Sequence, residues 1–245
     1  MAGPVCADAA LRFYYFNPDA PQHNLERLKN DMEMLLDRLE MEVDFQPFAR
    51  LTDFDRGVRN DRPSFVFAPD WYLHSYGERL QLKPLLQAVR DQRQDYQKVL
   101  VSASYSHEDM VASERITLAM TSLGPDSTEI LTTIFPDDAL VDLKKVRVVE
   151  VPKDADAIFA AALSQVDVAL VSQVSLQQFR AINPRLIDSL NLLGESRALD
   201  MPILGYVENS TSSEQLAMFR QFMISTGSSQ VMRTLRIDGW SEHNE

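Results

Sequence analysis

The chain alternates short apolar segments with amphipathic segments along nearly its whole length, and this alternation limits the fold more than any other feature. Leu11–Phe16, Met41–Phe48 and Phe65–Ala68 have the composition of strands. Between the first two, Leu25–Leu39 repeats leucine and methionine at spacings of three and four, which predicts a helix with one apolar face. A short helix is expected from Thr52 to Arg59. This order is typical of a parallel sheet covered by helices.

The same alternation continues to the end of the chain and divides into two stretches of about ninety residues each. A strand near 96–103 leaves the first stretch, and a strand near 203–207 returns to it. We therefore expect a two-lobed α/β fold, with residues 10–102 plus 203–245 in lobe 1 and residues 103–202 in lobe 2. Each lobe is expected to hold a mixed, mostly parallel sheet, and ligands of such folds lie beyond the carboxyl ends of the strands, in the cleft between the lobes. The remaining predicted strands are Leu82–Arg90, Tyr96–Ala103, Ile116–Ser122, Val146–Val151, Val168–Val171, Leu190–Glu195 and Ile203–Val207, and the remaining helices are Trp71–Tyr76, Ser127–Phe135, Asp154–Leu163, Ser175–Ile182 and Glu214–Thr226.

Composition excludes several classes of function. The formal net charge is −12 and no basic tract occurs, which argues against nucleic acid as a partner. The 8 glycines form no phosphate-binding loop, dinucleotide fingerprint or nucleophile elbow. A single cysteine, Cys6, and four scattered histidines give neither a disulfide within the chain nor the spacing of a zinc site. We expect no cofactor, no metal and no catalytic residues.

The amino-terminal residues bear on location. No apolar run approaches the roughly 18 residues that a membrane span needs. Val5 and Ala7 stand three and one positions before a possible cleavage point at Asp8, as after removal of a signal peptide. A periplasmic protein is the corresponding expectation.

The order of several short segments resembles the phosphate, phosphite and phosphonate solute-binding proteins of ABC importers. The resemblance extends over about residues 10 to 240 and implies a two-lobed carrier outside the cytoplasm with a membrane transporter component as partner. We expect the carrier to be a monomer. The segments that carry it are Leu11-Arg12-Phe13, the helix at Leu25–Leu39, Phe65-Val66-Phe67-Ala68-Pro69, Tyr96-Gln97-Lys98-Val99-Leu100-Val101, Val168-Ala169-Leu170-Val171-Ser172, Asn183-Pro184-Arg185-Leu186, Leu190–Ser196, Pro202-Ile203 and Leu235-Arg236-Ile237-Asp238-Gly239-Trp240.

The resemblance also implies an anion site, which this sequence departs from. Family members that take phosphonate carry a Ser-Thr-Ser turn at a helix start, where hydroxyl groups and free N–H groups hold an oxyanion. Ser127 and Thr128 match this turn, but Glu129 replaces the third serine and Asp126 adds a second negative charge. No histidine occurs at 151–155, where the family places one. These departures predict that phosphate and phosphonates bind no better than millimolar.

Aromatic and uncharged side chains remain at the expected cleft positions. Large rings with a polar tip suit an apolar ligand that is fixed by a few hydrogen bonds. The sequence therefore favours a mainly apolar, uncharged ligand, with a lipid such as a sterol or hopanoid as the leading hypothesis. The residues at these positions are Tyr15, Phe16, Asn17, Pro69, Asp70, Trp71, Tyr72, Tyr96, Ser172 and Gln173.

Other interpretations remain open from the sequence. A neutral aromatic metabolite fits the same rings, and an organic cation fits if Asp70 and Glu129 face the cleft. The resemblance itself favours an oxyanion carrier. A sensor or scaffold domain that has lost its ligand is a further alternative. Catalysis has only Asp70 or Glu129 as an acid or base, with no arranged nucleophile, and a non-enzymatic protein is expected.

Overall fold

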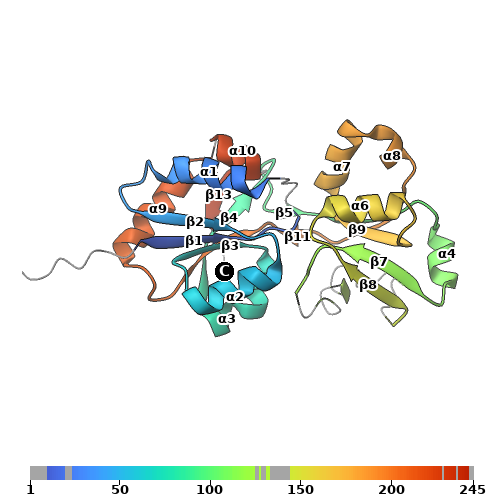
Figure 1. Ribbon diagram of the computed structural model, residues 1–245, viewed down its shortest axis with the longest axis horizontal. Coiled ribbons are helices and arrows are strands. Elements are labelled where there is room, and N and C mark those ends of the chain that lie inside the picture. The colour runs from blue at the N-terminus through green and yellow to red at the C-terminus, as the bar shows by residue number, and fades with distance from the viewer. Residues whose placement is uncertain are drawn as a thin grey trace, which may run out of the picture.

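Two sheets, each covered by helices, make up the molecule in a computed structural model (Figure 1). The structure describes residues 10–19, 24–124, 127, 131–132, 144–227, 229–235 and 237–242. The two sheets lie side by side along the long axis of the molecule, and a short two-stranded ribbon lies between them (Figure 1). The predicted two-lobed α/β fold is confirmed.

The first lobe is built on a six-stranded sheet with the order β13-β4-β12-β3-β1-β2. Strands β1, β2 and β3 run parallel, whereas β12 runs antiparallel to β3 and β4, and β13 runs antiparallel to β4. The strands are β1 (Leu11–Tyr15), β2 (Val43–Pro47), β3 (Phe65–Ala68), β4 (Leu82–Val89), β12 (Ile203–Val207) and β13 (Gly239–Glu242).

Helices cover both faces of this sheet because the side chains of its strands alternate between two apolar cores. Phe13 points into one core with Phe219 of α9, and Tyr14 belongs to the other core with Phe54 of α2. Helices α1 and α10 lie above the sheet in Figure 1, and α2 and α3 lie below it. The helices are α1 (Leu25–Leu36), α2 (Leu51–Asp61), α3 (Asp70–Leu80), α9 (Ser213–Ser225) and α10 (Gln230–Leu235).

The second lobe is built on a five-stranded sheet with the order β10-β6-β9-β7-β8. Strands β7, β8 and β9 run parallel, and β6 runs antiparallel to both β9 and β10. The elements are β6 (Lys98–Ser102), β7 (Ile116–Met120), β8 (Val146–Glu150), β9 (Val168–Ser172), β10 (Asn191–Glu195), α4 (His107–Ala112), α6 (Asp154–Ala162), α7 (Gln173–Ile182) and α8 (Pro184–Asp188).

The chain crosses between the sheets earlier than the sequence predicts. The sequence places residues 98–102 in lobe 1, but β6 pairs with β9 and β10 in the second sheet. The reason is that this strand is apolar on both faces and contributes Leu100 to one core of the second lobe and Val99 to the other. The two crossings run through β5 (Asp95–Tyr96) and β11 (Leu199–Asp200), which pair antiparallel as the ribbon.

Several short elements escaped the sequence prediction. Helices α4, α8 and α10 have at most 6 residues each, too few to show a helical period, and β13 has 4. The predicted helix at Ser127–Phe135 falls mostly outside the described residues, of which Ser127, Leu131 and Thr132 are helical.

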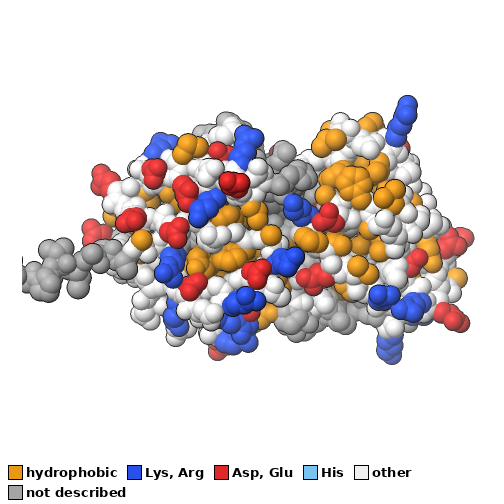
Figure 2. Space-filling view, in the orientation of Figure 1, with side chains coloured by type: hydrophobic (Ala, Val, Ile, Leu, Met, Phe, Trp, Pro, Cys, Tyr) orange, Lys and Arg blue, Asp and Glu red, His pale blue; other side chains and the backbone are white. Residues whose placement is uncertain are grey.

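Hydrophobic side chains gather on the surface of the second lobe in the region of α6 and α7 (Figure 2). Phe159 on α6, Leu163 at its end and Ile182 on α7 are exposed. Phe159 packs edge to face on Phe179, with ring centroids 5.4 Å apart. In the described part of the chain, no helix is long and apolar enough to cross a membrane.

Candidate functional site

A groove of about 200 Å³ lies between the two lobes. It is found beyond the carboxyl ends of β1 and β2 in the first lobe and of β7 and β8 in the second, where open α/β sheets bind ligands. Most of the lining residues are apolar, and Arg50 and Glu150 contribute one positive and one negative charge. The lining residues are Phe16, Pro18, Ala49, Arg50, Leu51, Thr52, Ser122, Glu150, Val151 and Pro152.

Helix N-termini meet at this groove. Helix α2 begins at the groove residue Leu51, and α6 begins at Asp154, two positions after the groove residue Pro152. Neither helix has a side-chain hydrogen bond at its N-cap residue, which is Arg50 for α2 and Lys153 for α6. The first N–H groups of a helix lack intrahelical partners and lie at the positive end of its dipole. The backbone dipoles at the groove therefore favour negative charge, whereas the acidic residues Asp53 and Asp154 in the first turns of the two helices oppose it.

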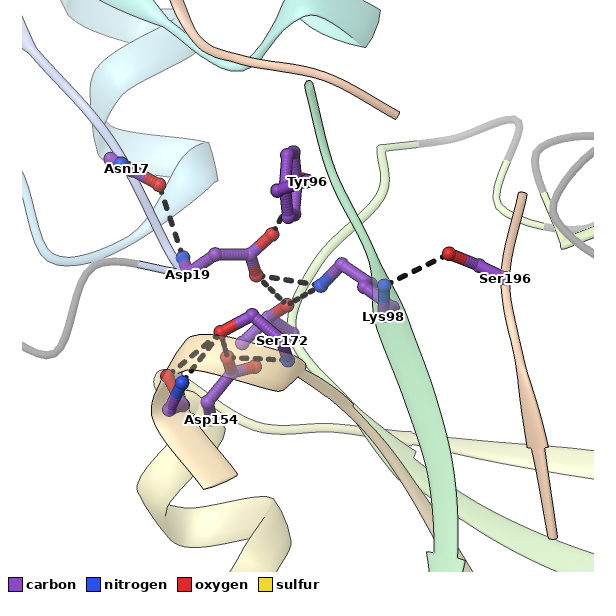
Figure 3. A network of polar contacts seen from close by, with 9 residues as sticks. Asn17, Asp19, Tyr96, Lys98, Asp154, Ser172 and Ser196 are labelled. Carbon is purple, nitrogen blue, oxygen red and sulfur yellow. Dashed lines mark hydrogen bonds and ion pairs between the residues drawn. The ribbon is translucent and has the colours of Figure 1, made fainter. Parts of the chain in front are cut away.

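A network of polar side chains joins the lobes beside the groove (Figure 3). Asp19, which follows the groove residue Pro18, accepts three hydrogen bonds on its carboxylate. Lys98 Nζ and Thr121 Oγ1 each donate to Asp19 Oδ1 at 2.7 Å, and Tyr96 Oη donates to Asp19 Oδ2 at 2.9 Å. Lys98 Nζ also donates to Thr121 Oγ1 at 3.2 Å. Asp19 follows β1 of the first lobe, whereas Lys98 begins β6 and Thr121 directly follows β7 in the second lobe, so the network spans the two lobes.

The charges in this network stabilise each other. The Lys98 side chain is 0% exposed and that of Asp19 13%. Burial opposes the charge of Lys98, but the carboxylates of Asp19 and Asp154 and the hydrogen bond to Asp19 hold the lysine pKa above its usual range. Burial likewise opposes the charge of Asp19, but Lys98, Thr121 and Tyr96 hold the aspartate pKa below its usual range. A buried ammonium and a buried carboxylate thus persist as an ion pair.

A second buried acid, Asp154, lies at the start of α6. Its Oδ2 accepts hydrogen bonds from the Ser172 backbone N–H at 2.9 Å and from Ser172 Oγ at 2.7 Å, and Ser172 in turn caps α7 through Ser175. Oδ1 of Asp154 is buried and has no hydrogen-bond partner among the described residues. Burial and the charge of Asp19 raise the pKa of Asp154 to about 6, against the opposing effects of Lys98 and Ser172.

The aromatic residues expected in the cleft lie mainly in the core of the first lobe. Tyr15 stacks on Phe67, with ring centroids 5.3 Å apart, and Tyr72 packs against Phe54 at 4.9 Å. Both tyrosines are buried. Phe16 is also buried, although it lines the groove. The rings at the strand ends therefore do not form an open aromatic surface, because Tyr15 is buried in the core with α1 and α9, whereas Phe16 and Tyr72 are buried in the core with α2.

Trp71 is half-buried and packs against cores of both lobes. A Cβ atom on Gly124 would lie 2.7 Å from the Trp71 ring, so glycine permits this close approach between the lobes. Gly124 also has φ +84°, in the left-handed region.

The other expected site residues are dispersed. Pro69 is the buried N-cap of α3, and Asp70 Oδ2 lies 3.0 Å from His74 Nδ1 on the same helix. Asn17 Oδ1 accepts a hydrogen bond from the backbone N–H of Asp19, so it supports the network. Gln173 begins α7 and lines a different groove, against Val99 and Leu190. Ser127 is described, whereas Thr128 and Glu129 lie outside the described residues.

Sequence reasoning missed four residues of the network. Asp19 and Thr121 follow strands and Asp154 begins a helix. No sequence pattern distinguishes these three polar residues from other polar residues at the ends of elements. Lys98 did offer a signal, because it is the one charge within the apolar run Lys98–Ser102. A lysine in a strand that is buried on both faces requires a buried partner. Among the described residues, no group of His, Cys, Asp and Glu could hold a metal ion.

Solved structures of binding proteins share this fold. A binding protein component of an ABC phosphonate transporter from Pseudomonas aeruginosa has a TM-score of 0.76 at 17% identity, covering 96% of this chain and 81% of that one. A Prochlorococcus marinus protein in complex with methylphosphonate has a TM-score of 0.74 at 13% identity, covering 96% and 93%. A Xanthomonas citri protein bound to chloride ion has a TM-score of 0.70 at 12% identity, covering 96% of this chain and 92% of that one. At these identities the likeness concerns the fold.

Sequence comparison identifies the family. A search of curated protein sequences finds no match. A family model described as "ABC transporter, phosphonate, periplasmic substrate-binding protein" matches residues 14–245. Because this match spans nearly the whole chain, the protein belongs to the periplasmic substrate-binding proteins of phosphonate ABC transporters, an extracytoplasmic and generally non-enzymatic family whose members bind small ligands and work with membrane transporter components.

Proposed function

We propose that the protein binds a small oxyanion of the phosphonate or phosphate class in the groove between its lobes and delivers it to an ABC importer. The observation that carries this proposal is the position of the groove at the uncapped N-termini of α2 and α6. An oxyanion there accepts hydrogen bonds from free backbone N–H groups of both lobes. One structural neighbour, the Prochlorococcus marinus protein, is in complex with methylphosphonate, a ligand of this class.

The size of the groove favours a small solute over a lipid. Sites for drug-sized ligands enclose roughly 300–1,000 Å³, whereas this groove encloses about 200 Å³. The sterol hypothesis also depended on an aromatic surface, and Tyr15 and Tyr72 are instead packed in the core. Neither the groove nor the comparisons support a lipid ligand.

The two charges of the groove set its preference. Arg50 stands at the start of α2 and Glu150 ends β8 on the opposite lobe, and both are exposed. Arg50 attracts an anion and Glu150 repels it, each by about 0.5–1 kcal/mol, because water screens exposed charges. The fixed backbone dipoles of the two helices act in addition to these side chains.

Calorimetric titration of the purified protein with methylphosphonate, phosphite and phosphate tests the proposal. We expect binding of at least one of them, weakened about two- to fivefold by Arg50→Ala and strengthened by a similar factor by Glu150→Gln. Arg56→Ala is the matched control, because Arg56 is exposed on the same helix but does not line the groove. Equal effects of Arg50→Ala and Arg56→Ala would remove the groove from the site. Binding of a sterol without binding of any of the three anions would overturn the proposal.

A further inference from the structure

Three donors from three separate segments converge on one carboxylate in the network beside the groove. Tyr96 comes from β5, Lys98 from the start of β6, and Thr121 from the residue after β7. Their polar atoms lie 2.7–2.9 Å from the oxygens of Asp19, and both oxygens are engaged (Figure 3). This is the donor set of an anion site, in which two charge-neutral hydroxyls and one ammonium surround an acidic group.

The donor set requires an anion at this position. Apart from Asp19, the only hydrogen-bond partner of the Lys98 ammonium among the described residues is Thr121 Oγ1. Asp154 lies close enough to affect the Lys98 pKa, but its hydrogen bonds go to Ser172. An ammonium that is 0% exposed and has no counter-ion is strongly disfavoured.

Asp19 supplies this anion from the other lobe. It follows β1 of the first lobe, and its backbone N–H donates to Asn17 Oδ1 at 3.2 Å, which fixes the turn that carries it. Nothing in the donor geometry is specific to an aspartate side chain, since a free carboxylate or phosphonate presents the same pair of oxygens to the three donors.

We propose that Tyr96, Lys98 and Thr121 form a carboxylate-binding site that Asp19 fills as an internal ligand. A tethered ligand acts at an effective concentration of the order of millimolar or more, so it excludes weakly binding free anions from the site. Asp19 is thus a specificity-determining residue: it confines the acidic group of a solute to the groove and keeps small carboxylates out of the inner position. Occupation of the site by Asp19 stands whether or not the groove binds a phosphonate, whereas its role in specificity rests on the proposed function.

Asp19→Ala tests the proposal, with acetate as the probe and calorimetry and thermal melting as the measurements. Acetate is expected to bind the variant at least about tenfold more tightly than it binds the wild-type protein, because the tethered competitor is gone. It should also raise the melting temperature of the variant and leave that of the wild type unchanged. Asp19→Ala combined with Lys98→Met should lose acetate binding. Asp44→Ala, which removes an exposed acid on β2, is the control and should behave as wild type.

Asp19→Asn keeps the proposal testable if Asp19→Ala does not fold. Its amide oxygen still accepts from Tyr96 or Thr121, but it no longer neutralises Lys98, so acetate should bind about threefold more tightly than to wild type. If every folded Asp19 variant binds acetate no better than wild type, the proposal is overturned. Wild-type binding of methylphosphonate without acetate binding by these variants would leave the proposed function standing. Acetate binding by the variants, with a wild-type protein that binds none of the three oxyanions, would overturn the proposed function alone.

Discussion

The two sides of the interlobe cleft use the residues at their strand ends in opposite ways. In the first lobe these residues carry large rings, such as Tyr15 at the end of β1 and Tyr72 after β3, and the rings are buried in the two cores of the lobe, Tyr15 on the side of α1 and α9 and Tyr72 on the side of α2. In the second lobe they carry small hydroxyls, such as Thr121 after β7 and Ser172 at the end of β9, and these bond to Asp19 and Asp154. Burial is almost complete on both sides, but one side is held by apolar packing and the other by polar pairing.

This difference shows which interactions stabilise a buried side chain at a strand end. A ring gains free energy from burial wherever a helix offers an apolar face, and Phe54 of α2 offers one to both Phe16 and Tyr72. A buried hydroxyl or carboxylate has no such option and must find a hydrogen-bond partner. On the second-lobe side, Thr121 therefore keeps a polar group facing the other lobe, where it bonds to Asp19.

The first test of the comparison removes one member of the polar pairing. Asp19→Ala should lower the free energy of unfolding by about 3–5 kcal/mol, because it leaves the Lys98 ammonium buried without the carboxylate that it is hydrogen-bonded to. Asp19→Leu combined with Lys98→Met, which removes both charges, should recover most of that loss. Urea unfolding followed by circular dichroism measures both. A loss below about 1 kcal/mol in Asp19→Ala would mean that water or another group compensates Lys98, and the polar side would then not depend on this pair.

The second test uses pH, because the pKa of Asp154 is raised to about 6 by burial and the charge of Asp19. In the unfolded chain an aspartate has a pKa of about 3.9. Between these values the folded protein holds a proton that the unfolded chain has released, so the contribution of Asp154 to stability is fully present below about pH 4 and falls as pH rises to about 6. Over that window wild type should lose about 1–3 kcal/mol relative to Asp154→Asn.

Urea unfolding of the wild type and Asp154→Asn at intervals from about pH 4 to pH 7 measures this difference. Asp156→Asn is the control, because Asp156 is on the first turn of the same helix and is exposed. Parallel pH curves for wild type and Asp154→Asn would contradict the raised pKa, and would show that Lys98 and Ser172 offset the burial of Asp154.

The comparison also explains which helices and strands could be predicted from the sequence. Apolar periodicity was enough to place most long elements, such as the strand at 65–68 and the helix from Leu25, because each buries an apolar face in its own lobe. It misplaced 98–102, since a strand that is apolar on both faces suits either sheet. Sheet membership depends on pairing between distant segments, which periodicity does not record.

The site was harder to predict than the fold for a related reason. Tyr15 and Tyr72 looked like ligand contacts because their polar tips suit a cleft, but ring orientation depends on which helix covers the strand end. Asp19 and Thr121 lie 102 positions apart in the sequence and meet only across the two lobes. Among the network residues that sequence reasoning missed, Lys98 alone carried a signal, as a charge in an apolar strand, and its partner remained unspecified.

The third test concerns Trp71, which links the apolar cores of the two lobes. Trp71→Ala should lower stability by about 1–3 kcal/mol, less than for a fully buried ring, because the side chain is half-buried. Gly124→Ala should also destabilise the protein, since its Cβ would lie 2.7 Å from the ring and its φ is +84°. The loss from Gly124→Ala should shrink in the Trp71→Ala background, leaving only the cost of the positive φ. Strictly additive losses in urea unfolding would mean that the two residues do not touch.

The fourth test has the smallest effect and compares two buried tyrosines within the aromatic side. Tyr72 Oη donates to Asp55 Oδ1 at 3.1 Å, whereas Tyr15 Oη is buried and makes no hydrogen bond of normal geometry among the described residues, although the Asn17 side chain lies close enough to act on its pKa. Tyr72→Phe should therefore lower the free energy of unfolding by about 1 kcal/mol, the net value of one hydrogen bond. Tyr15→Phe removes an unsatisfied hydroxyl and should leave stability unchanged or raise it slightly. Urea unfolding of the two variants under one condition gives the comparison directly. A larger loss of stability in Tyr15→Phe than in Tyr72→Phe would mean that the Tyr15 hydroxyl has a polar partner. Polar pairing would then hold buried side chains on the first-lobe side of the cleft as well as on the second-lobe side.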